Sequence, residues 1–367
     1  MKPIETLTTM NKAFTDLSEH LQTVEILSSA PCRLDVGGTW DLKCFAMPYA
    51  SLNPATTNIA ISARTGIRLR ACEPGYVRIL DEFHRETFPA DAPDMTGHFG
   101  LLFAIAAHFA LGGVEIEISY GCPPRSGVGG SGTLSVALAG ALACARERVG
   151  GERLSPEEIV EIVYNIEDGL RFSYTGLQDQ CAAAFGGVNT WRWTYGNPGG
   201  KFHREPILSR DQHSALGDRL LIAYIGKPHD SNDVNSRQVE DFLAGRHRGR
   251  WFRVNEIASE FAGALKRADW QAAGRLMDEE TAIRCAIVPA RMTVLGEKLQ
   301  AVCAEFGAGF ATAGSGNGGC VWALAPQAEL VPELSAAWRD VLSTVPTARI
   351  LPATVDAAGL DVRQVGP

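Results

Sequence analysis

A glycine-rich loop is the clearest candidate in the sequence for a site that does chemistry. It runs from Pro124 to Thr133, follows a strand-like segment at residues 114–118 and precedes an apolar helical segment at residues 134–144. Such a loop presents backbone N–H groups at the positive end of a helix dipole, an arrangement that suits a polyphosphate. Glycine is needed there because a side chain would hold the anion away from the backbone.

The spacing of the glycines excludes two common nucleotide-binding loops. No lysine follows them, so the loop is not a Walker A box, and the dinucleotide fingerprint does not fit. The loop resembles the phosphate loop of the GHMP kinases (galactokinase, homoserine, mevalonate and phosphomevalonate kinases), which reads Pro-x-x-x-Gly-Leu-Gly-Ser-Ser-Ala. Gly130 and Gly132 replace the first Ser and the Ala of that pattern. The resemblance implies that ATP is bound by Pro124, Ser126, Gly127, Val128, Gly129, Gly130, Ser131, Gly132 and Thr133.

A second segment carries two carboxylates twelve positions apart, Glu167 and Asp179. It resembles the region of GHMP sugar kinases in which Gly-x-x-Asp-Gln precedes a small-residue helix. The resemblance implies that Asp179 is the catalytic base, that Gly176 lies at the substrate, and that Glu167 and Ser131 hold Mg²⁺. Mg²⁺ prefers oxygen ligands, and phosphoryl transfer needs little more than positioning and charge neutralisation. The alternative is that both are ordinary surface carboxylates.

A third segment, residues 30–41, reads Ala-Pro-Cys-Arg-Leu-Asp-Val-Gly-Gly-Thr-Trp-Asp. It resembles the first motif of the same family, in the variant found in fucokinases and heptose-phosphate kinases. The resemblance implies that Arg33 lies beside Asp179, keeps it ionised and neutralises charge on the transferring phosphoryl group. It also implies that Asp41 accepts hydrogen bonds from sugar hydroxyls. Cys32 replaces the usual Gly, Asp41 stands one residue nearer to Arg33 than in the fucokinase type, and a structural salt bridge is the alternative role for Arg33.

A second glycine-rich stretch, residues 307–319, looks like the third motif of the family, Gly-Ala-Gly-x-Gly-Gly. The resemblance implies that it packs against the phosphate loop, with Gly314 and Gly316 near the nucleotide phosphates. A strand-like segment follows this stretch instead of a helix, which argues against a Rossmann site.

Three further features are less specific. The basic segment 246–253 contains interleaved aromatic residues, and it is either a solvated loop or a site for a phosphate already present on the substrate. Segment 229–236 is rich in helix-capping residues, although sugar contacts from Ser231 or Asn235 stay open. The eight histidines show no metal-ligand spacing.

The elements that must position these motifs alternate between strands and helices, which indicates an α+β protein. We expect paired strands at residues 59–62 and 67–71, further strands at 76–80, 219–225, 319–324 and 347–351, and helices at 100–111, 156–170, 233–244, 251–267, 291–306 and 327–343. The resemblance spans residues 25–330 and implies the GHMP kinase two-domain fold: an N-terminal domain like the second domain of ribosomal protein S5 and a ferredoxin-like C-terminal domain. We predict a helical extension at 1–23, an ATP-binding domain at 24–205 and a C-terminal domain at 206–367.

The composition narrows the class of protein. The 367 residues carry a formal charge of −8, which argues against a nucleic-acid partner. No apolar run approaches the ~20 residues that span a bilayer, and the N-terminus has no apolar signal core. Nine scattered cysteines without a CxxC pair indicate reduced thiols. We expect a cytoplasmic protein with no membrane partner, and the oligomeric state is not indicated.

These features predict an enzyme that uses ATP and Mg²⁺ to phosphorylate a small sugar. The segment Gly-x-x-Asp-Gln followed by Ala-Ala-Phe-Gly-Gly favours the sugar-kinase branch, and thus transfer to the anomeric hydroxyl to give a sugar 1-phosphate. Heptose-phosphate, fucose and galactose-type substrates are all open, as is a substrate that is already phosphorylated. The alternatives are a kinase for a non-sugar alcohol such as homoserine or mevalonate, and a sensor that binds sugar and ATP with little turnover.

Overall fold

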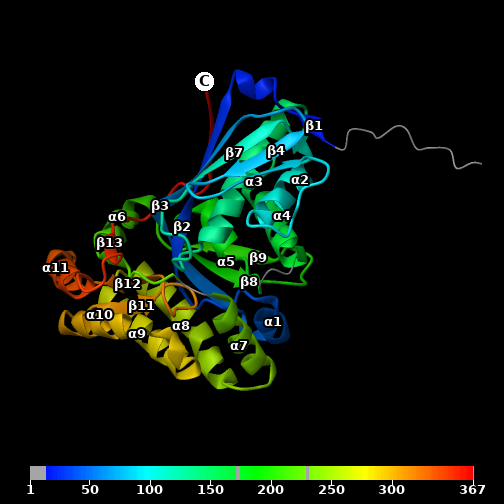
Figure 1. The fold of residues 1–367 in the computed structure, drawn as a ribbon. Coiled ribbons are helices and arrows are strands. Elements are labelled where there is room, and N and C mark those ends of the chain that lie inside the picture. The colour runs from blue at the N-terminus through cyan, green and yellow to red at the C-terminus, as the bar shows by residue number, and fades with distance from the viewer. Residues whose placement is uncertain (1–13, 171–173, 229–230, 367) are drawn as a thin grey trace, which may run out of the picture.

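The structure is a computed structural model that describes residues 14–170, 174–228 and 231–366 (Figure 1). Strands and helices are mixed along the chain and form two sheets with helices packed on them. The α+β class predicted from the sequence is therefore correct. Among the described residues, no helix is both long and apolar enough to cross a bilayer.

The larger sheet has eight strands in the order β14-β2-β3-β7-β4-β5, and β8 and β9 extend it from β3. Only β4 and β7 pair in parallel within it. Buried and partly exposed residues alternate along β7, as expected for a sheet with one face on the core. Its strands are β2 (Glu25–Val36), β3 (Ala55–Ala71), β4 (Tyr76–Leu80), β5 (Arg85–Pro89), β7 (Val114–Ser119), β8 (Val188–Trp193), β9 (Phe202–Pro206) and β14 (Asp361–Val365).

Helices α2 (Gly100–Phe109), α3 (Gly130–Arg148), α4 (Pro156–Leu170) and α5 (Gln178–Phe185) form a layer on this sheet (Figure 1). Helix α3 packs on β2 and β3, and 12 of its 19 residues are buried. It begins at the glycine-rich loop, so the loop is anchored at the middle of the core. Helix α4 begins after Ser155, which forms the predicted cap through reciprocal hydrogen bonds with Glu158.

The smaller sheet is antiparallel in the order β11-β12-β10-β13: β11 (Gly309–Thr312), β12 (Cys320–Leu324), β10 (Leu220–Tyr224) and β13 (Arg349–Leu351). Every residue of β10 and β12 is buried. Alternate residues of these strands join two different apolar clusters, because α8 (Arg248–Lys266) and α9 (Trp270–Ile287) cover one face and α10 (Val294–Glu305) and α11 (Val331–Leu342) cover the other. Helix α7 (Ser231–Leu243) lies near α1 (Lys43–Ala46) (Figure 1).

The remaining elements are short. They are β1 (Thr15–Asp16), β6 (Leu111–Gly112), α6 (His213–Gly217) and the 3₁₀ turns η1 (His20–Gln22), η2 (Met47–Leu52), η3 (Arg210–Gln212), η4 (Pro289–Arg291) and η5 (Ala328–Leu330).

Four expectations differ from the structure. Residues 59–62 and 67–71 are not paired strands but parts of the single long strand β3, which pairs with β2, β7 and β8. Helix α9 was not predicted. Of the predicted helical extension, the described part forms β1 and η1, and Leu17 and Leu21 are buried in the core. Strand β14, assigned to the C-terminal domain, pairs with β2 in the larger sheet.

Candidate active site

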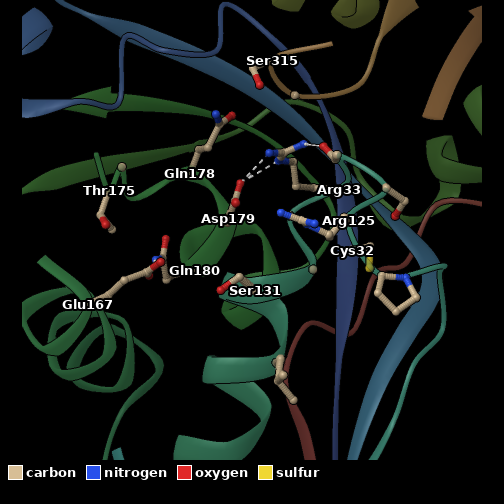
Figure 2. Close-up of a pocket in the computed structure, with 18 of the residues that line it drawn as sticks. Cys32, Arg33, Arg125, Ser131, Glu167, Thr175, Gln178, Asp179, Gln180 and Ser315 are labelled. Atoms are coloured by element: carbon tan, nitrogen blue, oxygen red, sulfur yellow. Dashed lines mark hydrogen bonds and ion pairs between the residues drawn. The ribbon is translucent and has the colours of Figure 1, made fainter. Parts of the chain in front are cut away.

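A cleft of about 600 Å³ brings the predicted motifs together (Figure 2). Its walls come from the end of β2, the phosphate loop, α4, the start of α5, α9 and the loop after β11. Predicted site residues that line it are Arg33, Asp41, Pro124, Ser126, Gly127, Gly129, Gly130, Ser131, Glu167, Gly176, Asp179 and Gly314. Four other predicted site residues do not line it: Val128, Gly132, Thr133 and Gly316.

The phosphate loop ends in the left-handed residue Gly129, and α3 begins at Gly130. Gly127 and Gly129 have φ angles of 79° and 80°, a conformation that only glycine adopts without strain. The first N–H groups of a helix have no partner within it, so those at the start of α3 are available to an anion. A Cβ on Gly130 would meet nothing within 4 Å, which leaves this end of the loop open.

The two glycine-rich loops touch through their backbones. A Cβ on Gly127 would lie 2.7 Å from the Ala313 carbonyl oxygen, and one on Gly314 would lie 2.7 Å from that of Gly127. The Cys320 N–H donates to the Ser126 carbonyl over 2.7 Å. Glycine at both positions is what permits this approach. The third motif therefore packs against the phosphate loop, with Gly316 set back against Arg291.

Arg33 and Asp179 form an ion pair, as the sequence predicted (Figure 2). The Arg33 Nη2 and Nε lie 2.7 and 2.8 Å from the Asp179 Oδ1, and Arg33 Nη1 also donates to Asp35 and to the Gly127 carbonyl. Burial opposes the charge of Arg33, which is 5% exposed, but Asp179 and Asp35 outweigh it and raise its pKa. Arg33 stays cationic, and it ties the predicted base to the phosphate loop.

Asp179 lies in the first turn of α5 and packs against the start of α3. A Cβ on Gly132 would lie 2.6 Å from the Asp179 Cβ, and one on Gly129 would lie 3.1 Å from its Cγ. The departure of Gly132 from the family's alanine thus has a local reason: in this chain the Cβ of Asp179 lies too close for a methyl group.

Asp41 lies at the other side of the cleft beside Gly176 and Gln178. Its carboxylate accepts the Gln178 N–H at 3.2 Å and the Gln178 Nε2 at 3.4 Å. A Cβ on Gly176 would lie 1.8 Å from the Asp41 Oδ2, so only glycine fits there. Burial, and secondly the charge of Asp179, raise the pKa of Asp41 to about 7. An acceptor with so few partners is suited to hydroxyl groups of a ligand.

Glu167 and Ser131 both line the cleft, on α4 and in the first turn of α3 (Figure 2). Gln180 Nε2 donates to Glu167 at 2.8 Å. Burial, then the charge of Asp179, raise the pKa of Glu167 to about 7. That shift marks a carboxylate with too little positive charge nearby. The carboxylate of Glu167 and the hydroxyl of Ser131 together offer the oxygen ligands that Mg²⁺ prefers. These residues therefore fit the ion that the sequence predicted.

Helix α9 supplies a part of the cleft that sequence reasoning missed. Arg284 lines the cleft; its Nη1 donates to Glu280 at 3.1 Å and its Nη2 donates to Thr39 at 3.1 Å. Glu280 also accepts the Gly37 N–H at 2.9 Å. A Glu and an Arg four residues apart were the only local signal, and such pairs are common on exposed helices.

The basic segment 246–253 does not line the cleft. Arg253 is paired with Glu256, Glu260 and Glu279, and Arg246 with Asp241. These pairs argue against a phosphate site, but the segment is not a solvated loop either, since α8 begins at Arg248 and Trp251 is buried. His229 and Asp230, and the side chains of Ser231 and Asn235, lie outside the described residues.

Cys32, which stands where the family has glycine, lines the cleft beside the thiol of Cys122. The hydrogen bond from Cys122 outweighs burial and lowers the pKa of Cys32. All nine cysteines are free, in agreement with reduced thiols.

Comparison with known proteins agrees with this geometry. Residues 99–187 match the family model for the GHMP kinases N terminal domain. No curated protein matches the sequence.

Solved structures resemble the chain over most of its length. A D-glycero-D-manno-heptose 1-phosphate kinase from Bacteriodes thetaiotaomicron is 17% identical with a TM-score of 0.70, covering 93% of this chain and 99% of its own. Lactococcus lactis galactokinase complexed with galactose is 16% identical with a TM-score of 0.69, and the match covers 92% of this chain and 95% of the galactokinase. The Methanococcus jannaschii mevalonate kinase is 16% identical with a TM-score of 0.66, and the match covers 90% of this chain and 98% of that kinase. At these identities the likeness concerns the fold, which is the one that the sequence predicted.

Proposed function

We propose that the chain transfers the γ-phosphoryl group of ATP to a hydroxyl of a sugar, because residues 99–187 match the family model for the GHMP kinases N terminal domain and solved sugar kinases share its fold. The observation that carries the proposal is the ion pair between Arg33 and Asp179 at the start of α3. It sets a carboxylate and a permanent cation beside a loop built to receive phosphates.

In this proposal Asp179 accepts the proton of the attacking hydroxyl, and Arg33 holds its carboxylate in place through their ion pair. The N–H groups at the start of α3 bind the nucleotide phosphates. Ser131 and Glu167 hold Mg²⁺, which when bound neutralises charge on those phosphates. Asp41 and Gln178 orient the acceptor through its other hydroxyls.

Charge in the cleft favours a neutral acceptor over an anionic one. The two guanidinium groups at the acceptor end are already engaged, Arg33 with Asp35 and Asp179, and Arg284 with Glu280. Four carboxylates surround them: Asp35, Asp41, Asp179 and Glu280. The carboxylate of mevalonate would lie among these acidic groups, and of the described lining residues Arg125 is the further cation that could meet it, whereas sugar hydroxyls can donate to Asp41.

Transfer to the anomeric hydroxyl, giving a sugar 1-phosphate, is the form of the reaction that we propose. The solved sugar kinases and the mevalonate kinases share the fold at similar identity, so a non-sugar alcohol is the competing substrate. A sensor that binds ATP and a sugar with little turnover is the second alternative.

The test is ADP release with Mg²⁺ and ATP over free hexoses, deoxyhexoses, heptoses and sugar phosphates, with homoserine and mevalonate included. We expect turnover with a sugar, and its loss in the Asp179→Asn variant excludes a contaminating kinase. Turnover with mevalonate or homoserine alone would refute the sugar assignment. Binding of ATP and a sugar without ADP release would favour the sensor.

A further inference from the structure

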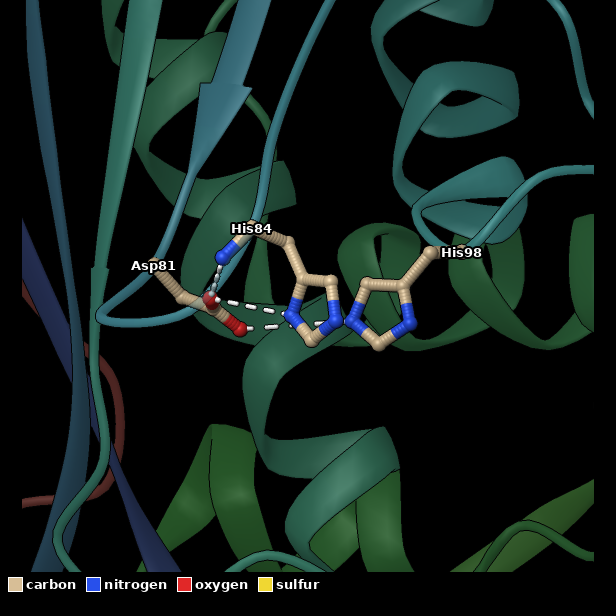
Figure 3. Close-up of side chains that lie close together, drawn as sticks. All are labelled: Asp81, His84 and His98. Atoms are coloured by element: carbon tan, nitrogen blue, oxygen red, sulfur yellow. Dashed lines mark hydrogen bonds and ion pairs between the residues drawn. The ribbon is translucent and has the colours of Figure 1, made fainter.

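A cluster of potential metal ligands lies outside the proposed chemistry, where the sequence predicted none (Figure 3). Asp81 follows β4, His84 stands in the turn before β5, and His98 precedes α2. One ligand atom from each lies within 4.8 Å of the others. The fold gathers residues whose spacing in sequence matches no metal motif.

Asp81 is a fixed anchor of this cluster. Its side chain is 4% exposed, and its Oδ1 accepts the backbone N–H groups of Phe83 and His84, each at 2.8 Å. Its Oδ2 accepts the hydroxyl of Tyr120 at 3.0 Å.

The two imidazoles face this carboxylate from the solvent side. Their rings are stacked with centroids 4.0 Å apart, and both side chains are about half exposed. His84 Nδ1 lies 3.4 Å from Asp81 Oδ1, and His98 Nε2 lies 4.0 Å from Asp81 Oδ2. Neither imidazole comes as close as an ordinary hydrogen bond requires. Around a tetrahedral zinc ion with N and O ligands at about 2.1 Å, neighbouring ligand atoms are roughly 3.4 Å apart, so small side-chain movements would complete the site.

The surroundings of the cluster also favour a cation. The Oε2 of Glu86 is buried and has no hydrogen-bond partner among the described residues, and it would lie 3.3 Å from a Cβ on Gly97, the neighbour of His98. Phe99 packs edge-on against both imidazoles and closes the inner side. The cluster thus has a carboxylate oxygen without a partner near Gly97 and an aromatic ring against its imidazoles.

We propose that Asp81, His84 and His98 bind a divalent transition-metal ion of the zinc type. Two imidazoles and a carboxylate suit Zn²⁺, Co²⁺ or Ni²⁺, whereas Mg²⁺ prefers oxygen ligands. A three-residue set leaves at least one position for water or another ligand. The proposal does not depend on the reaction that the cleft performs.

The ion would sit at the rim of the cleft and tie two segments together. His98 and Tyr120 line the cleft, and His84 belongs to the β4–β5 turn. Metal binding would therefore hold that turn against the start of α2.

The experiment titrates the full-length protein, freed of metal with a chelator, with Zn²⁺ by calorimetry and with Co²⁺ by visible absorption. Co²⁺ bound by thiolates shows strong charge-transfer bands in the near ultraviolet, whereas nitrogen and oxygen ligands do not, so the spectrum separates this site from the cysteines. The variants are His84→Ala and His98→Ala. His108→Ala, an exposed histidine at the other end of α2, is the matched control.

We expect a site with a nitrogen and oxygen spectrum in the parent protein and in His108→Ala, and Zn²⁺ affinity at least about tenfold weaker in His84→Ala and His98→Ala. Both histidines are half exposed, so thermal unfolding in chelator should be unchanged and shows that the variants fold. Added Zn²⁺ should raise the unfolding temperature of the parent and the control but not that of the two variants. Equal affinity in all four proteins, or no binding by the parent, would overturn the proposal.

Discussion

Asp179 is placed by three independent neighbours, which is why a change at this residue is informative. Arg33 holds its carboxylate, and the missing side chains of Gly129 and Gly132 make room for it against α3. Such a position is difficult to explain as a surface carboxylate. A role of Asp179 as the base explains both the cation that Arg33 provides and the missing side chains at Gly129 and Gly132.

For Asp179→Asn we expect turnover to fall by about 10²–10⁴-fold, the usual contribution of a general base. The amide oxygen can still accept a hydrogen bond from Arg33, so folding and nucleotide binding should persist. Steady-state kinetics and nucleotide titration measure the two effects separately. Turnover at the parent rate would exclude Asp179 as the base.

Asp41 predicts a pH dependence of stability in the ligand-free protein. Burial and Asp179 raise the pKa of Asp41 from 3.8 to about 7. Between these values the unfolded chain is ionised while the native carboxyl holds a proton, so stability falls as the pH rises through this window. Asp41→Asn removes the pH dependence of stability that Asp41 causes. The similar pH dependence from Glu167, whose pKa is also raised to about 7, is present in both the variant and the parent.

We therefore expect the unfolding temperature of Asp41→Asn, relative to the parent, to rise by roughly 2–4 °C between pH 5 and pH 8, since the parent loses about 2–3 kcal/mol in this window and 1 kcal/mol shifts the unfolding temperature of a chain this long by about 1–2 °C. Thermal unfolding without ligand at both pH values measures it. Asp91→Asn, at an exposed carboxylate, serves as the control. A difference that does not change with pH would contradict the assignment.

At the scale of elements, the phosphate loop and the start of α3 contain two glycines with opposite surroundings. A methyl group on Gly132 would collide with Asp179, while one on Gly130 would meet nothing within 4 Å. Both are the positions at which this chain departs from the family pattern.

We predict that Gly132→Ala lowers turnover by about tenfold or more by displacing Asp179, since small misplacements of a catalytic group can cost as much as 10²-fold. Gly249→Ala, in α8 outside the cleft, is the control: a Cβ there would meet nothing within 4 Å, so this variant should fold and turn over like the parent. Steady-state kinetics of both variants measure the loss of turnover, and their unfolding temperatures show whether the variants remain folded. Equal activity of the two would show that Asp179 tolerates the shift.

The elements also show what could be predicted from the sequence. The strand-like segment before the glycines, the helix after them and the cap at Ser155 depend on local pattern, and they were found. Helix α9 was missed, and with it Glu280 and Arg284, because its pattern resembles a solvated helix and its contacts with Gly37 and Thr39 are long-range. The cluster of Asp81, His84 and His98 was missed for the same reason: only the packing of β4, β5 and α2 brings it together.

At the scale of the whole molecule, the cleft is built from both sheets and their helices. Arg284 and Glu280 on α9 reach Thr39 and Gly37 after β2, and the loop after β11 packs on the phosphate loop. Strand β14 returns the C-terminal end of the chain to the larger sheet. The two halves therefore share one cleft, as a transfer between a nucleotide and an acceptor requires.

The most direct test of this account is ³¹P NMR of the reaction with Mg²⁺, ATP and the sugar that gives the fastest ADP release. The account predicts a new sugar phosphate resonance that grows in step with ADP, is split by the anomeric proton, and is absent with Asp179→Asn. Formation of ADP with inorganic phosphate alone, or no product with any sugar while mevalonate is phosphorylated, would contradict it.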